Sequence, residues 1–177
     1  TGSSGNTISS NINGVDIADT ATFTSSSDII TGNTTDNLVH SSGGTSSFSN
    51  TDFEYDSDTS LTSILGGTVN VYYSTRAAVE GATSGIVTWT DTNDAGVVDS
   101  NNETTGLQTI ANGYTPYITP LVYTMTSAGA GSLNDLTATL TLAGYVPTST
   151  TYTLDSVDEE VSVALTLLSD AVYADAT

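Results

Sequence analysis

The sequence predicts an all-β protein, and three observations lead to this conclusion. Thr, Ser, Asn and Gly, not Glu and Lys, fill most positions outside the 37% hydrophobic residues. Thr, Val, Ile and Tyr are the residue types that suit a pleated sheet. Several segments alternate apolar and polar residues, and Gly, Pro and Asp clusters separate them. The 177 residues fit a single domain. We therefore expect a single β-sandwich, of jelly-roll or immunoglobulin-like type, with an N-terminal extended strand.

Residues 1–24 are expected to form an N-terminal arm that contains this strand. Val15, Ile17, Ala21 and Phe23 fall on one face of an extended chain, although Asp19 interrupts that face. The predicted division is therefore an arm at 1–24 and a sandwich domain at 25–177. The pattern shows no internal repeat of 20–50 residues.

The strand signals become stronger along the chain. Residues 68–75 (TVNVYYST) and 85–91 (GIVTWTD) each predict a strand. The clearest alternation lies in the last third, where Leu136, Ala138, Leu140 and Leu142 alternate with threonines. A second alternating run begins at Val161. These spacings are typical of a sandwich.

Charge excludes several classes of partner. The formal net charge is −19, and the chain holds one Arg, one His, no Lys and no Cys. Nucleic acid is not expected as a partner, because almost no cation is present to displace the counterions of phosphate. No stretch reaches about 18 consecutive apolar residues, so no membrane span is expected. We expect a secreted or cell-surface protein.

No constellation predicts catalysis. His40 and Arg76 have no recognisable motif around them, and no Gly-x-Ser-x-Gly turn accompanies the single histidine. Arg76 is expected to pair with a carboxylate, and His40 is expected to be incidental. We therefore predict that the chain is not an enzyme.

Calcium is the expected cofactor if a metal is bound. Residues 91–99 resemble the calcium loops of EF-hand and dockerin modules, with oxygen ligands at Asp91, Asn93, Asp94 and Asp99 and a glycine for the turn. Ala95 occupies a position where an acid is expected, and the flanking segments are predicted as strand and loop instead of helices, which argues against an intact EF-hand. A loop of solvated carboxylates is the alternative interpretation.

A second acidic group precedes residue 60. Asp52, Glu54, Asp56 and Asp58 share one face of an extended chain. These carboxylates repel one another, and a bound cation would offset that repulsion. The alternative is a solvated edge that discourages edge-to-edge pairing. The acidic residues at 155–160 predict a polar turn more than a metal site.

Two further surface features are candidates for function. Trp89, Tyr114, Tyr117 and Tyr123 are candidates for an aromatic platform for sugar rings, although a core position is more usual for Trp89. Asn33 and Asn102 each begin an Asn-x-Thr sequon, which predicts N-glycosylation in a secreted protein.

The combination of a Lys- and Cys-poor, Thr/Ser/Asn-rich chain, a polar arm and a strand at residues 15–23 resembles the subunits of archaeal and bacterial extracellular β-sandwich filaments, such as threads and bundling pili. It is also similar in composition to surface-layer proteins. In those filaments, the N-terminal strand of one subunit completes the sandwich of the next. The resemblance implies a polymer of identical subunits in which Val15, Ile17, Ala21 and Phe23 form the interface.

The sequence therefore predicts a structural subunit of an extracellular filament or surface assembly that polymerises by strand donation. Two alternatives remain open. One is a calcium-dependent carbohydrate-binding or adhesion module, with glycans as partners. The other is a viral capsid or decoration protein.

Overall fold

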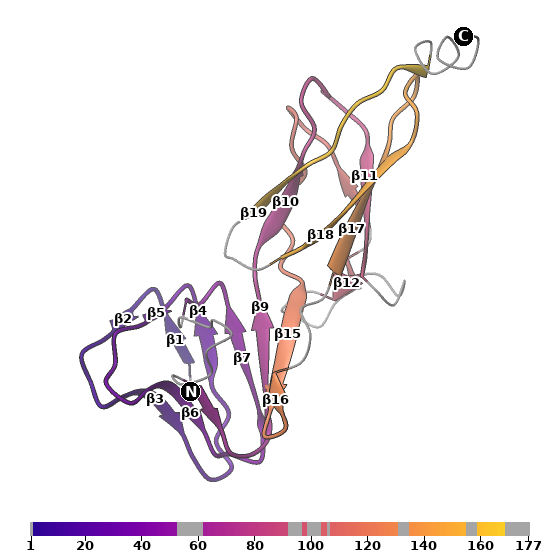
Figure 1. Cartoon of the computed structure of the whole chain (residues 1–177). Helices are drawn as coiled ribbons and strands as arrows, with labels where there is room; N and C mark the ends of the chain where they lie inside the picture. The colour runs from indigo at the N-terminus through magenta and orange to yellow at the C-terminus, as the bar shows by residue number, and fades with distance from the viewer. Residues whose placement is uncertain are drawn as a thin grey trace. The chain divides into compact units, whose positions relative to one another are not determined.

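The computed structural model of the chain is all-β, which confirms the predicted class (Figure 1). It describes residues 2–52, 62–91, 97–98, 104–105, 107–130, 135–154 and 159–168. Among these residues, no helix is long and apolar enough to cross a membrane. The chain divides into two compact units. The first comprises Thr1–Tyr73 and Leu121–Leu133, and the second comprises Ser74–Pro120 and Asn134–Thr177.

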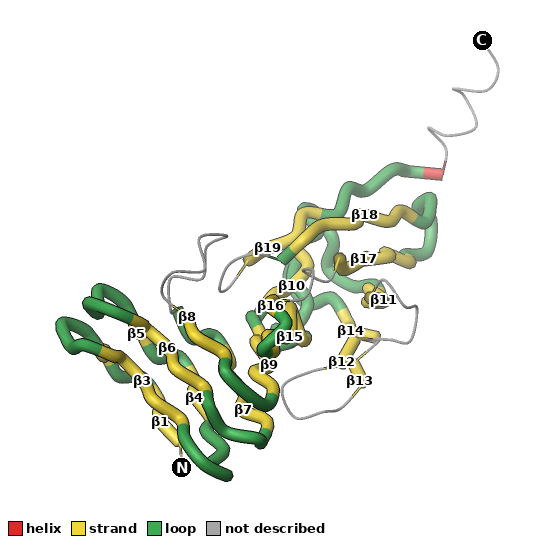
Figure 2. The backbone as a smooth tube through the Cα atoms, turned by 60° about the horizontal axis from the view of Figure 1, so that its bottom comes forward, coloured by secondary structure: helices red, strands yellow, loops and turns green. Residues whose placement is uncertain are grey.

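The first unit is a parallel β-solenoid, whose stacked coils are visible in Figure 2. Its chain visits three parallel sheets in turn and then begins again. The first sheet contains β1 (Gly2–Ser4), β4 (Thr24–Ser26), β7 (Thr45–Ser49) and β9 (Thr68–Tyr72). The second contains β2 (Thr7–Ile8) and β5 (Ile29–Ile30), and the third contains β3 (Asn13–Ile17), β6 (Asp36–His40) and β8 (Thr62–Ile64).

The coils form a repeat that is visible in the strand pairing. In the first sheet, Gly2 pairs with Thr24, and Thr24 pairs with Ser47. In the third sheet, Leu38 pairs with Thr62. The expectation that the chain has no repeat in this range is therefore wrong. The repeat is one of backbone pairing, and its length varies by a residue from coil to coil.

The corners of successive coils share an unusual backbone conformation. Gly5, Ser27 and Asn50 follow equivalent strands, and all three have positive φ angles, of 66°, 55° and 48°. Ser10 and Gly32 repeat this at the next corner, with φ of 62° and 63°. Left-handed conformations favour Gly and small polar residues. The Ser/Asn/Gly-rich composition of this region supplies the residues that such turns need.

The interior of the solenoid mixes apolar and polar side chains. Ile30, Leu38 and Phe48 are fully buried, and Phe23 packs against Phe48 with ring centroids 5.9 Å apart. The same interior holds buried polar residues, namely Ser25, Asp28, Asn33, Asn37, His40, Ser42, Ser46 and Thr51. Such groups are tolerated in a core only when hydrogen bonds satisfy them.

His40 shows how this is done. Its Nδ1 lies 2.8 Å from the Gly66 carbonyl oxygen and its Nε2 lies 3.0 Å from Ser46 Oγ. Ser46 Oγ in turn accepts a hydrogen bond from the Phe23 backbone N–H at 3.0 Å. Because a carbonyl only accepts, Nδ1 carries a proton and donates to the Gly66 carbonyl oxygen. His40 is therefore a structural link between coils and not an incidental loop residue.

The N-terminal segment is part of this body. Strands β1, β2 and β3 pair in parallel with β4, β5 and β6 of the same chain. The expected boundary at residue 24 therefore falls inside the first unit, between its first and second coils. This intramolecular pairing contradicts an arm whose strand is given to a neighbouring subunit.

The largest sheet of the second unit is antiparallel, and it contains segments in which alternation predicts strands. One sheet has the order β14 (Leu107–Thr109), β11 (Ile86–Asp91), β17 (Asp135–Thr141) and β18 (Thr148–Thr153). A second pairs β10 (Thr75–Ala78) in parallel with β19 (Glu159–Ser162), and β12 (Val97–Val98) pairs with β13 (Thr104–Thr105). The core contains Trp89, Leu136, Ala138 and Leu140, each no more than 1% exposed. This unit is sandwich-like.

Candidate functional site

The strongest candidate site is the N-terminal end of the solenoid, which we call the coil-1 face and define as the outer side of residues 2–17, including the outer edges of β1, β2 and β3. Within the described part of the chain, each of these strands pairs along one edge only. Their other edges leave backbone N–H and C=O groups open, as any edge strand does. The unpaired edges of three parallel strands therefore lie on the same side of this unit.

Asparagines reinforce the stacking of the first coil on the second. The Asn6 backbone N–H donates to Asp28 Oδ1 at 2.7 Å, and its Nδ2 donates to the same oxygen at 3.2 Å. Asn11 repeats the arrangement with Asn33, whose Oδ1 accepts from Asn11 N at 3.1 Å and lies 3.4 Å from Asn11 Nδ2. In both pairs, the side-chain oxygen of the later coil receives donors from the earlier coil.

At the coil-1 face the equivalent oxygen acceptors are present, but no described residue donates a hydrogen bond to them. Asn6 and Asn11 use their nitrogen atoms, but neither Oδ1 accepts a hydrogen bond from a described residue. Asn13 Oδ1 is buried and has no partner among the described residues. By the repeat, the oxygens of Asn6 and Asn11 stand where a preceding coil would supply N–H donors.

Asp28 anchors this corner as a buried carboxylate that is only 1% exposed. Burial opposes its ionisation. Hydrogen bonds from the Ser25 hydroxyl, at 2.6 Å, and from Asn6 and Ser3 outweigh burial, so the pKa of Asp28 lies below its usual value. The carboxylate is thus ionised at neutral pH and fixes the first coil on the second.

The first sheet is closed at its opposite end. The free edge of β9 pairs with the antiparallel strand β15 (Leu121–Thr126), which continues into β16 (Gly129–Ala130). Terminal repeats of solenoids commonly carry such caps. The two ends of this sheet therefore differ, and the end formed by β1 has no cap among the described residues.

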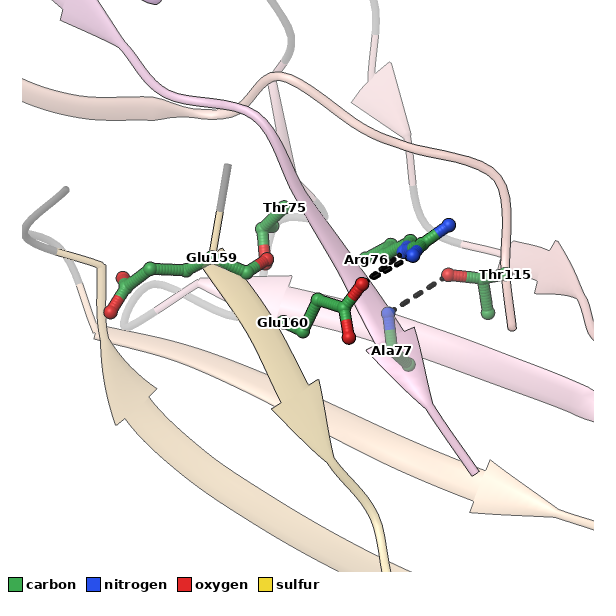
Figure 3. Close-up of polar contacts among 6 residues, drawn as sticks. All are labelled: Thr75, Arg76, Ala77, Thr115, Glu159 and Glu160. Atoms are coloured by element: carbon green, nitrogen blue, oxygen red, sulfur yellow. Dashed lines mark hydrogen bonds and ion pairs between the residues drawn. The ribbon is translucent and has the colours of Figure 1, made fainter. Parts of the chain in front are cut away.

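The second unit holds a cluster around Arg76, the only Lys or Arg residue of the chain (Figure 3). Arg76 and Glu160 are paired positions on β10 and β19, and Arg76 Nε donates to Glu160 Oε1 at 2.9 Å. The Glu160 contact raises the pKa of Arg76. Arg76 Cζ also lies 4.1 Å and 4.8 Å from the ring centroids of Tyr114 and Tyr117. The expected pairing of Arg76 with a carboxylate is confirmed.

The interface residues predicted from the sequence all belong to the solenoid. Ile17 is 3% exposed, Val15 is half-buried on β3 opposite Leu38, and Phe23 packs against Phe48 with its ring tilted by 44°. Ala21 is exposed, and its carbonyl oxygen accepts a hydrogen bond from Ser42 Oγ at 2.5 Å. The side chains of Val15, Ile17 and Phe23 and the backbone of Ala21 therefore make contacts between coils of one chain.

Most of the predicted metal ligands, namely Asn93, Asp94, Asp99, Glu54 and Asp56, lie outside the described residues. Asp91 is half-buried at the end of β11, and Asp52 is exposed and bridges Ile29. Within the described ranges, no three His, Asp or Glu side chains gather into a group that could hold a metal ion. Calcium binding therefore stays a prediction.

The aromatic and glycosylation candidates separate into different environments. Trp89 and Tyr123 are buried, whereas Tyr114 and Tyr117 are 41% and 49% exposed. Asn33 is 6% exposed and its Nδ2 donates to Asn37 Oδ1 at 2.8 Å, which argues against a glycan on that nitrogen. Asn102 lies outside the described residues.

Sequence reasoning missed Asn6, Asn11 and Asp28, which form side-chain hydrogen bonds between the first and second coils. Their signal was a spacing of 22 residues, which separates Asn6 from Asp28 and Asn11 from Asn33. It was weak because Asn, Ser and Thr are common throughout the N-terminal part of the chain. A comparison of the sequence with known family models, and another with curated proteins, found no match.

Proposed function

We propose that this chain is a structural subunit of an extracellular surface assembly, and that two copies associate through their coil-1 faces. The observation that carries the proposal is the coil-1 face itself, with its three open strand edges and its unpaired asparagine oxygens. Backbone edges of this kind gain affinity by pairing with another strand edge.

A second copy suits this face for two reasons. Open edges carry both donors and acceptors, so the same surface on two copies can pair antiparallel about a two-fold axis. The face is also weakly charged for this chain. Asp16 and Asp19 are the only charged residues among residues 2–23, although the whole chain carries −19. Repulsion between two copies that meet at these faces is therefore weaker than the net charge of the whole chain suggests.

Edge pairing replaces strand donation in this proposal. The first coil already pairs with its own second coil, so no segment needs to leave the body. The shortage of Lys and Cys and the abundance of Thr, Ser and Asn support an extracellular structural role. Assembly beyond a pair requires a second contact elsewhere on the subunit.

The test uses two exposed apolar residues of the same unit. Ile12, in the first coil, is 74% exposed, and Leu65, which follows β8, is 70% exposed. Molar mass is measured by light scattering over a range of concentrations for the chain, for Ile12→Glu and for Leu65→Glu. We expect Ile12→Glu to weaken association about tenfold or more and Leu65→Glu to leave it unchanged. A chain that stays monomeric at all concentrations, or equal effects of the two variants, would contradict the proposal.

A further inference from the structure

We propose that the second unit carries a binding site for neutral carbohydrate in a cleft beside Tyr114. The cleft measures about 810 Å³ and is formed by the end of β10, the turn at 111–114 and the segment after β19. This volume lies in the range of about 300–1,000 Å³ that is typical of small-ligand sites. All of its lining residues belong to the second unit.

The walls of the cleft are held by backbone hydrogen bonds. The Val79 N–H donates to the Gly113 carbonyl at 2.7 Å, and the Val163 N–H donates to the Ala78 carbonyl at 2.9 Å. The end of β10 is therefore hydrogen-bonded to the turn at 111–114 on one side of the cleft and to the segment after β19 on the other. Val79 and Val163 are buried beneath it, so the cleft rests on the core of the unit.

Tyr114 is presented by a tight turn. Ala111 and Tyr114 exchange backbone hydrogen bonds of 2.8 and 3.2 Å, and the residues between them, Asn112 and Gly113, have φ of 54° and 85°. Two positive φ angles on an Asn-Gly pair are the signature of a type I′ hairpin turn. This turn fixes the backbone on which the tyrosine ring is mounted.

The ring itself is held by Arg76. The Arg76 guanidinium lies 4.1 Å from the Tyr114 ring centroid, and its bond to Glu160 holds it in place. Tyr114 nevertheless remains 41% exposed and lines the cleft. A pre-positioned aromatic ring loses little conformational freedom when a ligand stacks on it.

Polar groups surround this ring. Glu80, Asn112 and Ser162 line the same cleft, and their side chains form no hydrogen bond with a described residue. A sugar has an apolar C–H face and polar hydroxyl groups, and an aromatic ring beside a carboxylate, an amide and a hydroxyl can contact both. The C–H face of the sugar packs on the ring, and its hydroxyl groups donate to and accept from the polar side chains.

The charge of the protein selects among carbohydrates. A net charge of −19, with Glu80 in the cleft, repels uronic acids and sulfated sugars. The one nearby cation, Arg76, is already paired with Glu160. The expected ligand is therefore a neutral oligosaccharide.

The test is titration by NMR and calorimetry of the full chain with three neutral hexasaccharides, of glucose, N-acetylglucosamine and mannose. A hexasaccharide of galacturonic acid serves as the acidic control. We expect at least one neutral hexasaccharide to bind and the acidic one not to bind. Failure of all three neutral sugars to bind, or tighter binding of the acidic sugar, would overturn the proposal.

Two matched variants assign binding to the cleft. Tyr114→Ala should weaken binding about tenfold, whereas Tyr117→Ala should leave it unchanged, because Tyr117 also stacks on Arg76 but does not line the cleft. Asn112→Gly keeps the turn and removes the amide, and it should weaken binding by a smaller factor. The emission of the buried Trp89 checks that each variant is folded. Equal losses in the two tyrosine variants would overturn the assignment. The outcome is independent of coil-1 association, because that face lies in the other unit.

Discussion

Asn6 and Asp28 occupy equivalent corners of two successive coils, and Asp28 Oδ1 accepts hydrogen bonds from both the backbone and the side chain of Asn6, at 2.7 and 3.2 Å. This contact ties the first coil to the second through a buried charge. In this contact the later coil supplies an oxygen acceptor to the coil before it. Asn6 is the equivalent residue of the first coil, and its side-chain oxygen is an acceptor of the same kind at the coil-1 face, with no donor among the described residues. The stability of the solenoid therefore depends on this repeated geometry, and the proposed association of two coil-1 faces would use it again.

Asp28→Asn should destabilise the solenoid by about 1.5–3 kcal/mol, the usual worth of hydrogen bonds to a charged group. The substitution turns one carboxylate oxygen into a donor, which then faces the Ser25 hydroxyl or the Asn6 N–H groups. Denaturant unfolding followed by far-ultraviolet circular dichroism measures the change. Asp16→Asn is the control, because Asp16 is exposed on β3 and should alter stability little. Equal losses in both variants would show that Asp28 has no special role.

The same carboxylate predicts a dependence on acid pH. Its pKa in the folded chain is lowered, so its contribution is complete above the unfolded value of about 4 and is lost as the pH falls through the folded value. The difference in unfolding free energy between the chain and Asp28→Asn should therefore shrink below about pH 4. Unfolding curves from pH 7 to pH 2 test this. A difference that stays constant over that range would be inconsistent with an ionised Asp28.

Gly67→Ala should destabilise the solenoid by about 2 kcal/mol or more, through backbone strain and a steric collision. Gly67 has a φ of 63°, and a methyl group there would collide with the carbonyl oxygens of Gly44 and Ser42. The left-handed conformation costs about 1–2 kcal/mol for other residues, and the collision adds to that. Gly43→Ala is the matched control, because a methyl group at Gly43 meets no atom within 4 Å. Thermal unfolding of the two variants should therefore differ clearly.

Tyr152→Phe tests the second unit. The Tyr152 hydroxyl lies 2.8 Å from Thr75 Oγ1, so its loss should cost about 0.5–1.5 kcal/mol. Burial raises the pKa of Tyr152 despite that hydrogen bond, and Glu159 raises it further. Because the unfolded phenol ionises first, stability should fall as the pH rises above about 10, and the variant should lose less over that range. Identical alkaline curves for the two chains would contradict this placement of Tyr152.

The alternating pattern was sufficient to predict the sandwich-like unit. Leu136, Ala138 and Leu140 point into the core as the period of two requires, and Val161 and Val163 do the same near the end of the described chain. These strands bury apolar side chains against one another, so their pattern reports their structure directly. The predicted pairing of Arg76 with a carboxylate was confirmed for a simpler reason. A single cation among so many carboxylates has many partners available.

The solenoid was not predictable by the same reasoning, because polar residues occupy much of its interior. Ile17, His40 and Ile64 are equivalent positions in three coils, and the middle one is a buried histidine. A repeat of apolar residues cannot be recognised in the sequence when one of the equivalent positions holds a polar residue. The coil length also varies, since the step from Ile17 to His40 is a residue shorter than the step from His40 to Ile64, and this removes any fixed period. Hydrogen bonds, which hydropathy does not register, make this core stable.

The most direct test of the account is amide hydrogen exchange of the chain, measured at low and at high protein concentration. Pairing of two coil-1 faces predicts that amides in residues 2–17 become slower to exchange at high concentration, while those of β11 and β17 keep their rates. Exchange that does not depend on concentration in residues 2–17, or protection gained only in the second unit, would contradict association through the first coil.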